Sequence, residues 1–210
     1  MDREPTVFIV DDDPAVRQAL SVLVASMRLR AETYASAQGF LDQYDASKPG
    51  CMLLDVRMPG ISGLELLERL TQRADHVPVI IISAYGDVPM VVRAMKAGAL
   101  SFLEKPCRDQ QLWETIQEAL KWDTENRKRL ARKARIERQI ARLTAGEREV
   151  LEMLVEGKSN KAIAAELGLS VRTIEVRRAK VMQKMGADSL AELVRLAVSA
   201  REICGKPHSR

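Results

Sequence analysis

The chain has few cysteines, histidines and aromatic residues, and these shortages exclude several classes of function. Its 210 residues include three cysteines and two histidines, and no two of Cys51, Cys107 and Cys204 are closely spaced. Without paired cysteine or histidine ligands, the sequence offers no zinc site and no disulfide framework. We therefore expect reduced thiols with structural roles.

Long hydrophobic runs are also missing. The longest apolar run, Val79–Ile82, falls far short of the roughly 20 residues that a membrane helix needs. Three of the first five residues are charged, and this start lacks the apolar stretch of a secretion signal. With 46% hydrophobic and 30% charged residues, the composition is ordinary for a globular protein. These features predict a cytoplasmic protein with no membrane partner.

No aromatic residue follows Trp122, and the net charge changes sign near the same point. Residues 1–121 contain 13 Lys and Arg against 17 Asp and Glu, a net of −4, whereas residues 122–210 contain 20 against 12, a net of +8. A basic second half indicates a polyanionic partner. Because readers of RNA and of single strands stack bases on aromatic rings, the missing rings favour double-stranded DNA.

The first 121 residues alternate short runs of Val, Ile and Leu with amphipathic stretches. The runs predict strands at 6–10, 31–34, 51–54, 77–82 and 101–103, and the stretches predict helices at 15–27, 37–44, 63–73, 89–97 and 110–122. Strands that alternate with helices form parallel sheets covered on both faces. We expect residues 1–121 to form a doubly wound α/β domain, with a five-stranded parallel sheet of order 2-1-3-4-5.

Residues 122–142 are rich in charged helix formers, and we expect a helical linker. A rough apolar stripe runs along this segment at Leu130, Ala134, Ile136, Ile140 and Leu143. The stripe is too brief for sustained heptads, so two alternatives stay open. One is a charged helix surrounded by solvent, and the other is a short coiled coil that pairs two chains.

Residues 143–210 show helix signals and no strand signal, which predicts an all-α domain of four helices. Their N-caps are expected at Thr144, Ser159, Ser170 and Ser189. Residues 159–180 predict a helix, a turn at Gly168 and a second helix, the order of a helix-turn-helix motif. Such helix pairs also occur in proteins that do not bind DNA. Here the second helix carries four basic residues, which favour DNA binding: Arg172, Arg177, Arg178 and Lys180.

Polar residues follow four of the predicted strands, and strand ends in a parallel sheet share one crevice. These residues are Asp11 and Asp12, Asp55, Ser83 and Lys105. Each signal alone is typical of a turn or a helix cap, but together they suit phosphoryl transfer. Asp55 can act as the nucleophile, the other two carboxylates attract Mg²⁺, and the lysine can hold the transferred group. The crevice is therefore predicted to be a phosphorylation site.

Segments 9–13, 54–60, 83–87 and 104–106 resemble the receiver domain of two-component response regulators, over about residues 5–122. The resemblance implies that Asp55 accepts a phosphoryl group from a sensor histidine kinase. It implies a magnesium site formed by Asp11, Asp12, Asp55 and the backbone carbonyl of Arg57, and a switch formed by Ser83, Lys105 and Phe102. It also implies a cis peptide bond before Pro106. Cys107 departs from the family, which usually carries an aromatic or larger apolar residue there.

Residues 143–198 resemble the LuxR-type DNA-binding domain, and the whole chain is similar to the NarL/FixJ family of response regulators. The resemblance places six residues near DNA phosphates: Asn160, Lys161, Thr173, Arg177, Arg178 and Lys180. It places four near base edges: Arg172, Glu175, Val176 and Ala179. Two positions depart from the family pattern, because Gly146 stands where an arginine is usual and Arg177 where a histidine is common.

We thus expect a phosphorylation-dependent transcription regulator and not an enzyme. Phosphorylation would promote a homodimer through residues 88–97 and 100–103, which would bind promoter DNA and work with RNA polymerase. Two rival functions are a phosphatase with an aspartyl intermediate and a phosphate relay without DNA contact. The first would turn over free phosphoesters, and the second would bind no duplex.

Overall fold

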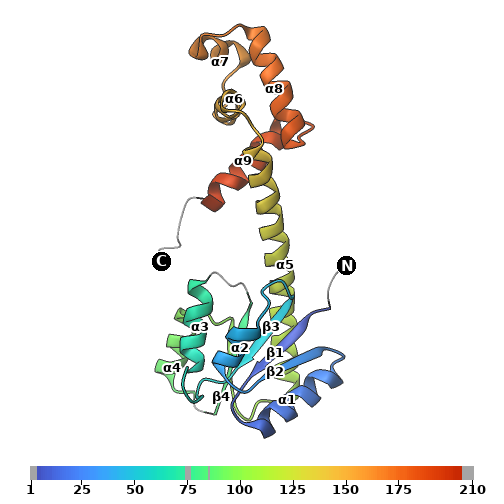
Figure 1. Ribbon diagram of the computed structural model, residues 1–210, viewed down its shortest axis with the longest axis vertical. Helices are drawn as coiled ribbons and strands as arrows, with labels where there is room; N and C mark the ends of the chain where they lie inside the picture. Colours follow the sequence, from blue (N-terminus) through green and yellow to red (C-terminus); the bar gives the residue numbers. More distant parts are fainter. Residues whose placement is uncertain (1–3, 74–76, 85, 205–210) are drawn as a thin grey trace. The chain divides into compact units, whose positions relative to one another are not determined.

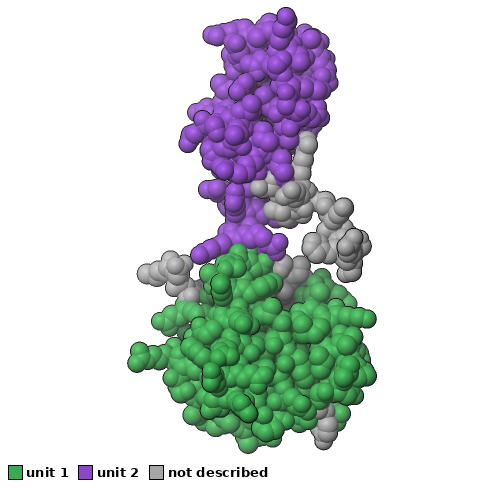
Figure 2. Space-filling view, turned by 180° about the vertical axis from the view of Figure 1, so that it is seen from behind, with its two compact units in different colours: residues 1–127 green, residues 128–210 purple. Residues whose placement is uncertain are grey.

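The computed structural model describes residues 4–73, 77–84 and 86–204, with side chains up to residue 198. It divides into two compact units, residues 1–127 and residues 128–210 (Figures 1 and 2). The long helix α5 (Asp109–Ala141) contributes residues to both. Tyr85 of the predicted switch segment, both histidines and the side chain of Cys204 lie outside the described residues.

The first unit contains a parallel sheet of β1 (Thr6–Val10), β2 (Arg30–Tyr34), β3 (Gly50–Leu54), β4 (Val79–Ser83) and β5 (Ser101–Glu104). The strand order is β2-β1-β3-β4-β5, and every neighbouring pair is parallel (Figure 1). The predicted doubly wound α/β fold is confirmed. All four C-terminal strand ends named in the sequence therefore lie along one edge of the sheet.

Helices cover both faces of this sheet: α1 (Pro14–Ser26), α2 (Ala37–Gln43), α3 (Gly63–Gln72), α4 (Val88–Lys96) and the first part of α5. Successive residues of β1 point to opposite layers, as the period of a strand requires. Phe8 packs in the cluster with α2, α3 and α4, whereas Ile9 packs in the cluster with α1 and α5. Because both faces are covered, β1, β3 and β4 are apolar and buried along nearly their whole length.

Helix α5 is longer than the helix predicted at 110–122, because it continues without a break to Ala141. Its middle is fastened to the first unit, where the Asp123 carboxylate accepts from the Gly50 N–H at 2.9 Å and pairs with Arg127 at 2.8 Å. Its end belongs to the second unit, where Ile136 is buried in the core and Ile140 packs against it. Part of the predicted apolar stripe therefore packs in the core of the chain's own second unit.

Helices are the only regular secondary structure among the described residues of the second unit, which confirms the predicted all-α domain. It comprises the end of α5 with α6 (Ala145–Val155), α7 (Asn160–Leu167), α8 (Val171–Met185) and α9 (Leu190–Cys204). Thr144, Ser159 and Ser170 are the N-caps of α6, α7 and α8, and Thr144 forms a complete capping box with Glu147. The N–H of Glu192 donates to the Ser189 hydroxyl at 3.2 Å. All four predicted caps therefore form.

The helix-turn-helix consists of α7 and α8. Gly168, with φ of 64°, ends α7 in the left-handed conformation that glycine adopts without strain, so the chain turns at once into α8. Ile163 and Ile174 are fully buried between the helices. Among the described residues, no helix combines the length and apolar character needed to cross a membrane.

Candidate functional sites

Three of the predicted polar residues meet at the C-terminal edge of the sheet, each just beyond a strand. The ammonium of Lys105, after β5, donates to Asp11 Oδ2 at 2.7 Å and to Asp55 Oδ1 at 2.8 Å. Both aspartates are buried, while the lysine side chain is 22% exposed. The fold thus brings together residues that lie 94 and 50 positions apart in the sequence.

Backbone donors hold the second oxygen of each carboxylate. Asp11 Oδ1 accepts from the Asp13 N–H at 2.9 Å, and Asp55 Oδ2 accepts from the Arg57 N–H at 2.6 Å. The side chain of Arg17, in the first turn of α1, donates to the Asp11 carbonyl at 2.8 Å. Each carboxylate is therefore held by a backbone N–H of its own loop on one oxygen and by the Lys105 ammonium on the other. Sequence reasoning missed Arg17, because an arginine on an amphipathic helix gives no signal that distinguishes it from a solvated one.

The electrostatics keep the lysine charged. Burial works to lower the pKa of Lys105, but the hydrogen bonds that its ammonium donates to Asp11 and Asp55, and the negative charges of these carboxylates, outweigh that effect and raise the pKa above its ordinary value. At neutral pH the ammonium is therefore a positive charge beside two buried carboxylates.

The residues suit a hard cation, although they form no complete cage. Within the described ranges, no three acidic, histidine or cysteine side chains gather as a metal-binding group, and Asp12 is exposed. Magnesium commonly binds through one or two carboxylates and keeps several waters, so it needs no dedicated cage. Asp11 and Asp55 both lie within hydrogen-bonding distance of one ammonium, and their oxygens are the donors that such a cation prefers.

The predicted switch residues lie beside this site. Ser83 ends β4 and is buried, and its carbonyl accepts from the Lys105 N–H at 2.8 Å. Phe102 lies in β5 and is half-buried against the core. A Cβ atom on Gly86 would be 3.1 Å from Cε1 of the Phe102 ring, so Gly86 lies directly against the ring. The Lys105–Pro106 peptide bond is cis, as the resemblance implies.

The outer face of α8 carries the residues expected near base edges. Arg172, Glu175, Val176 and Ala179 are all exposed. The Arg172 side chain is 85% exposed, with its Nη1 atom 3.7 Å from the Glu175 carboxylate. Because Ile174 and Val181 occupy the opposite face in the core, the burial pattern agrees with the predicted helix-turn-helix. These four side chains therefore lie on the exposed side of α8, opposite its core-facing side.

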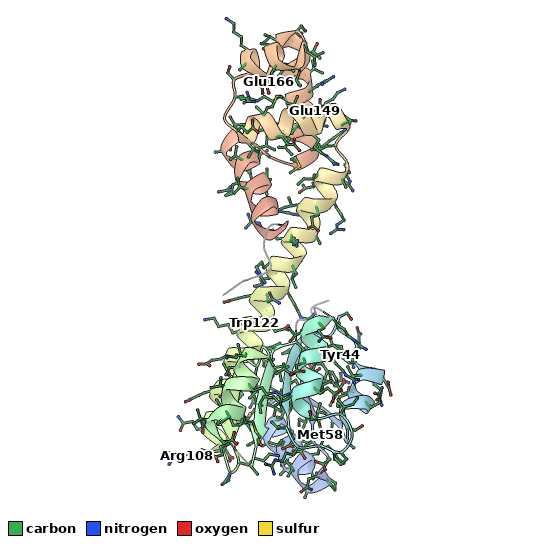
Figure 3. The ribbon with its side chains drawn as sticks, turned by 90° about the vertical axis from the view of Figure 1, so that its left-hand side faces the viewer. Tyr44, Met58, Arg108, Trp122, Glu149 and Glu166 are labelled. Atoms are coloured by element: carbon green, nitrogen blue, oxygen red, sulfur yellow. The ribbon has the colours of Figure 1, made fainter. Side chains whose placement is uncertain are left out.

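The residues expected near phosphates differ in their contacts. Arg178 Nη1 donates to Asn160 Oδ1 at 3.1 Å, which ties α8 to the start of α7. The Thr173 and Ser170 hydroxyls are 2.8 Å apart. Lys161 and Lys180 are exposed, whereas Arg177 is half-buried. Acidic side chains also reach the surface of this unit on α6 and α7, at Glu149 and Glu166 (Figure 3).

An ion pair that the sequence did not reveal joins α6 to α8. Lys184 Nζ lies 2.6 Å from the Glu147 carboxylate and also donates to the Arg142 carbonyl at 3.2 Å. The lysine hydrogen bond lowers the pKa of Glu147, and the backbone N–H of Thr144 adds to that shift. Glu147 thus takes part in the capping box of α6 and also in the ion pair that joins α6 to α8.

Two protein-family models match the chain. Residues 7–117 match the response regulator receiver domain, and residues 141–197 match the bacterial regulatory proteins of the luxR family. The chain therefore belongs to the two-component response regulators, and its receiver and LuxR-type domains place it in the NarL/FixJ family. It is a response regulator that acts as a transcription factor, and its relatives are regulators rather than enzymes.

Individual relatives extend over both domains. The transcriptional regulatory protein FixJ of Azorhizobium caulinodans is 47% identical over 194 residues, which cover 92% of each chain. The response regulator TodT of Pseudomonas putida is 40% identical and covers 93% of this chain and 86% of its own. Among solved structures, the response regulator StyR has a TM-score of 0.84 at 44% identity, covering 93% of this chain and 98% of that one. Full-length FixJ from B. japonicum has a TM-score of 0.58 at 43% identity, covering 95% and 98%.

Proposed function

We propose that phosphorylation of Asp55 by a sensor histidine kinase in the cytoplasm controls promoter binding by the C-terminal domain. The observation that carries this proposal is the Lys105 ammonium held between Asp11 and Asp55. In the transfer, an Asp55 oxygen forms a bond to phosphorus while the bond between phosphorus and the kinase histidine breaks. The lysine then stabilises the charge on the phosphoryl oxygens.

The proposed reaction also needs a divalent cation. Asp11, Asp12, Asp55 and the Arg57 carbonyl are the groups that would hold Mg²⁺, and the cation would neutralise charge on the transferred group. The chain's own part is to aim the nucleophile. The Arg57 N–H fixes one oxygen of Asp55 and the lysine fixes the other, so the carboxylate is oriented before the donor arrives.

We propose that Ser83 and Phe102 convert the modification into a change of surface. The Ser83 hydroxyl would hydrogen-bond a phosphoryl oxygen, and the ring of Phe102 would turn inward behind it. The surface affected is α4, where Val88 is 75%, Val92 45% and Met95 47% exposed. Exposed apolar residues of this kind favour pairing through residues 88–97 and 100–103. A few kcal/mol of differential contact is enough to reverse a minority population.

A homodimer formed in this way would present two copies of α8 to DNA. Helix-turn-helix dimers read half-sites spaced roughly 34–36 Å apart. In the proposal, the base-edge residues are Arg172, Glu175, Val176 and Ala179, and the phosphate residues are those named in the sequence: Asn160, Lys161, Thr173, Arg177, Arg178 and Lys180. The bound dimer would then engage RNA polymerase.

DNA selection from a random duplex library tests the proposal, with and without a small-molecule phosphodonor and Mg²⁺. We expect phosphorylated wild-type protein to enrich a specific site and to bind it more tightly than unmodified protein does. Asp55→Asn keeps the shape of the side chain but cannot form the acyl phosphate, so it should show none of this gain. Equal binding in all samples would refute phosphorylation control, and no binding in any would refute DNA binding.

A further inference from the structure

Arg177 of α8 lies directly against Gly146, in the first turn of α6. A Cβ atom on residue 146 would be 2.7 Å from Nη1, 2.9 Å from Cζ and 3.3 Å from Nη2 of Arg177. These distances are shorter than ordinary van der Waals contact. The guanidinium therefore occupies the space that a side chain at position 146 would need.

This arginine has no partner among the residues that the structure describes. The other cation that α8 directs at the start of α6 is Lys184, seven residues further on and so on the same face of the helix. Lys184 is paired with Glu147, whereas the described residues offer Arg177 neither a hydrogen bond nor an ion pair. Its five donors in a planar fork suit a phosphate.

We infer that Gly146 and Arg177 act as a pair in DNA binding. Because Gly146 has no side chain, the Arg177 guanidinium can lie against α6, and from this position it contacts a DNA phosphate. The inference rests on the proposed DNA-binding function and concerns affinity for the DNA backbone, not base readout.

The same two positions are those at which the module departs from the LuxR-type pattern, which has arginine and histidine there. The contact gives this coincidence a physical reason. With arginine at both positions, two guanidinium groups would compete for the same space and repel each other. A glycine at position 146 therefore allows position 177 to hold arginine in place of the shorter histidine.

A double-mutant cycle on the full-length protein tests the pairing. The probe is a fluorescent duplex of random sequence, titrated over a range of salt with the phosphodonor present. Arg177→Ala should weaken binding about tenfold and make the salt slope shallower by about one. Gly146→Ala should displace the guanidinium and cost part of that affinity. Combined with Arg177→Ala, it should cost nothing further.

Two features separate the pairing from damage to the fold. Alanine is a better helix former than glycine, so Gly146→Ala should leave the melting temperature of the helical unit unchanged or higher while DNA affinity falls. The swap Gly146→Arg with Arg177→His should recover most of the affinity that Arg177→His alone loses. Arg172 is the matched control, because its exposed side chain pairs with Glu175 instead. Losses from Arg172→Ala and Gly146→Ala should be additive.

Several results would overturn the inference. Additive losses from Gly146→Ala and Arg177→Ala, or unchanged binding by Arg177→Ala, would show that the two residues do not act together. In either case the proposed function would stand, because wild-type protein would still bind DNA. Absence of binding by wild-type protein, with and without the phosphodonor, would overturn both.

Discussion

Replacing Arg127 with alanine should destabilise the first unit strongly, because this residue fastens α5 to the loop before β3. Arg127 Nε donates to the Asp123 carboxylate at 2.8 Å, and its Nη atoms donate to the Ala46 and Lys48 carbonyls at 3.1 and 2.5 Å. Asp123 itself is 2% exposed and also accepts from the Gly50 N–H. Arg127 thus pairs with the buried Asp123 carboxylate and also binds the backbone carbonyls of the loop before β3.

The size of the effect follows from what Arg127→Ala leaves behind. Removing one partner of a buried ion pair costs about 3–5 kcal/mol, because the other charge stays buried and uncompensated. Arg127 is 28% exposed, so water can reach part of the vacated space. We therefore expect the low end of that range, about 3 kcal/mol. Arg127→Lys keeps the charge but lacks the planar fork, and it should lose an intermediate amount.

Tryptophan fluorescence during urea unfolding measures this loss in the full-length protein. Both tryptophans, Trp113 and Trp122, lie in the first unit (Figure 3 labels the second), so the signal reports that unit alone. Lys121→Ala, at an exposed position of the same helix, is the control and should stay within about 0.5 kcal/mol of wild type. A loss below about 1 kcal/mol for Arg127→Ala would refute the role given to the buried pair.

Two further predictions concern titratable groups. Because Lys184 lowers the pKa of Glu147 below the ordinary 4.5, the ion pair should stabilise the helical unit above that pH and lose its effect as the pH falls through the lowered value. Circular dichroism melts should show this dependence in wild type and a weaker one in Lys184→Met, because the Thr144 N–H still bonds Glu147 in the variant. Burial raises the pKa of Cys51 to about 12, so thiol reagents should modify it only on unfolding. Labelling of Cys51 as fast as of half-buried Cys107 would contradict this.

The architecture of the first unit was predictable because its signals are local and periodic. Apolar runs buried on both faces marked β1, β3 and β4, and the polar residues at their ends marked the edge where the site lies. The end of α5 had no such signal. Residues 110–141 are continuously helix-forming, so the sequence cannot show where one unit stops. That point depends on tertiary contacts, those of Asp123 and Arg127 on one side and Ile136 on the other.

The apolar stripe in the predicted linker shows the same limit. Periodicity could not distinguish residues that face a partner chain from residues that face their own core. In the structure Ile136 is 1% exposed, and Ile140 and Leu143 pack with it in the second unit. A coiled coil built on these residues would have to uncover that core. Likewise, the contact between Gly146 and Arg177 joins positions 31 residues apart, which no local pattern connects.

The acidic site explains why the proposed switch needs both its lysine and a cation. Asp11, Asp12 and Asp55 carry a formal charge of −3 against +1 on Lys105, so the crevice has a net charge of −2. In the proposal, a divalent cation held by these carboxylates would cancel that excess, and an acyl phosphate on Asp55 would add a further negative charge. The lysine now bonds two carboxylates at once, and contact with phosphoryl oxygens would draw it from at least one of them. Since Lys105 directly follows β5, this exchange would act on the strand that carries Phe102, and in the proposal the modification would thereby change a surface away from the phosphate itself.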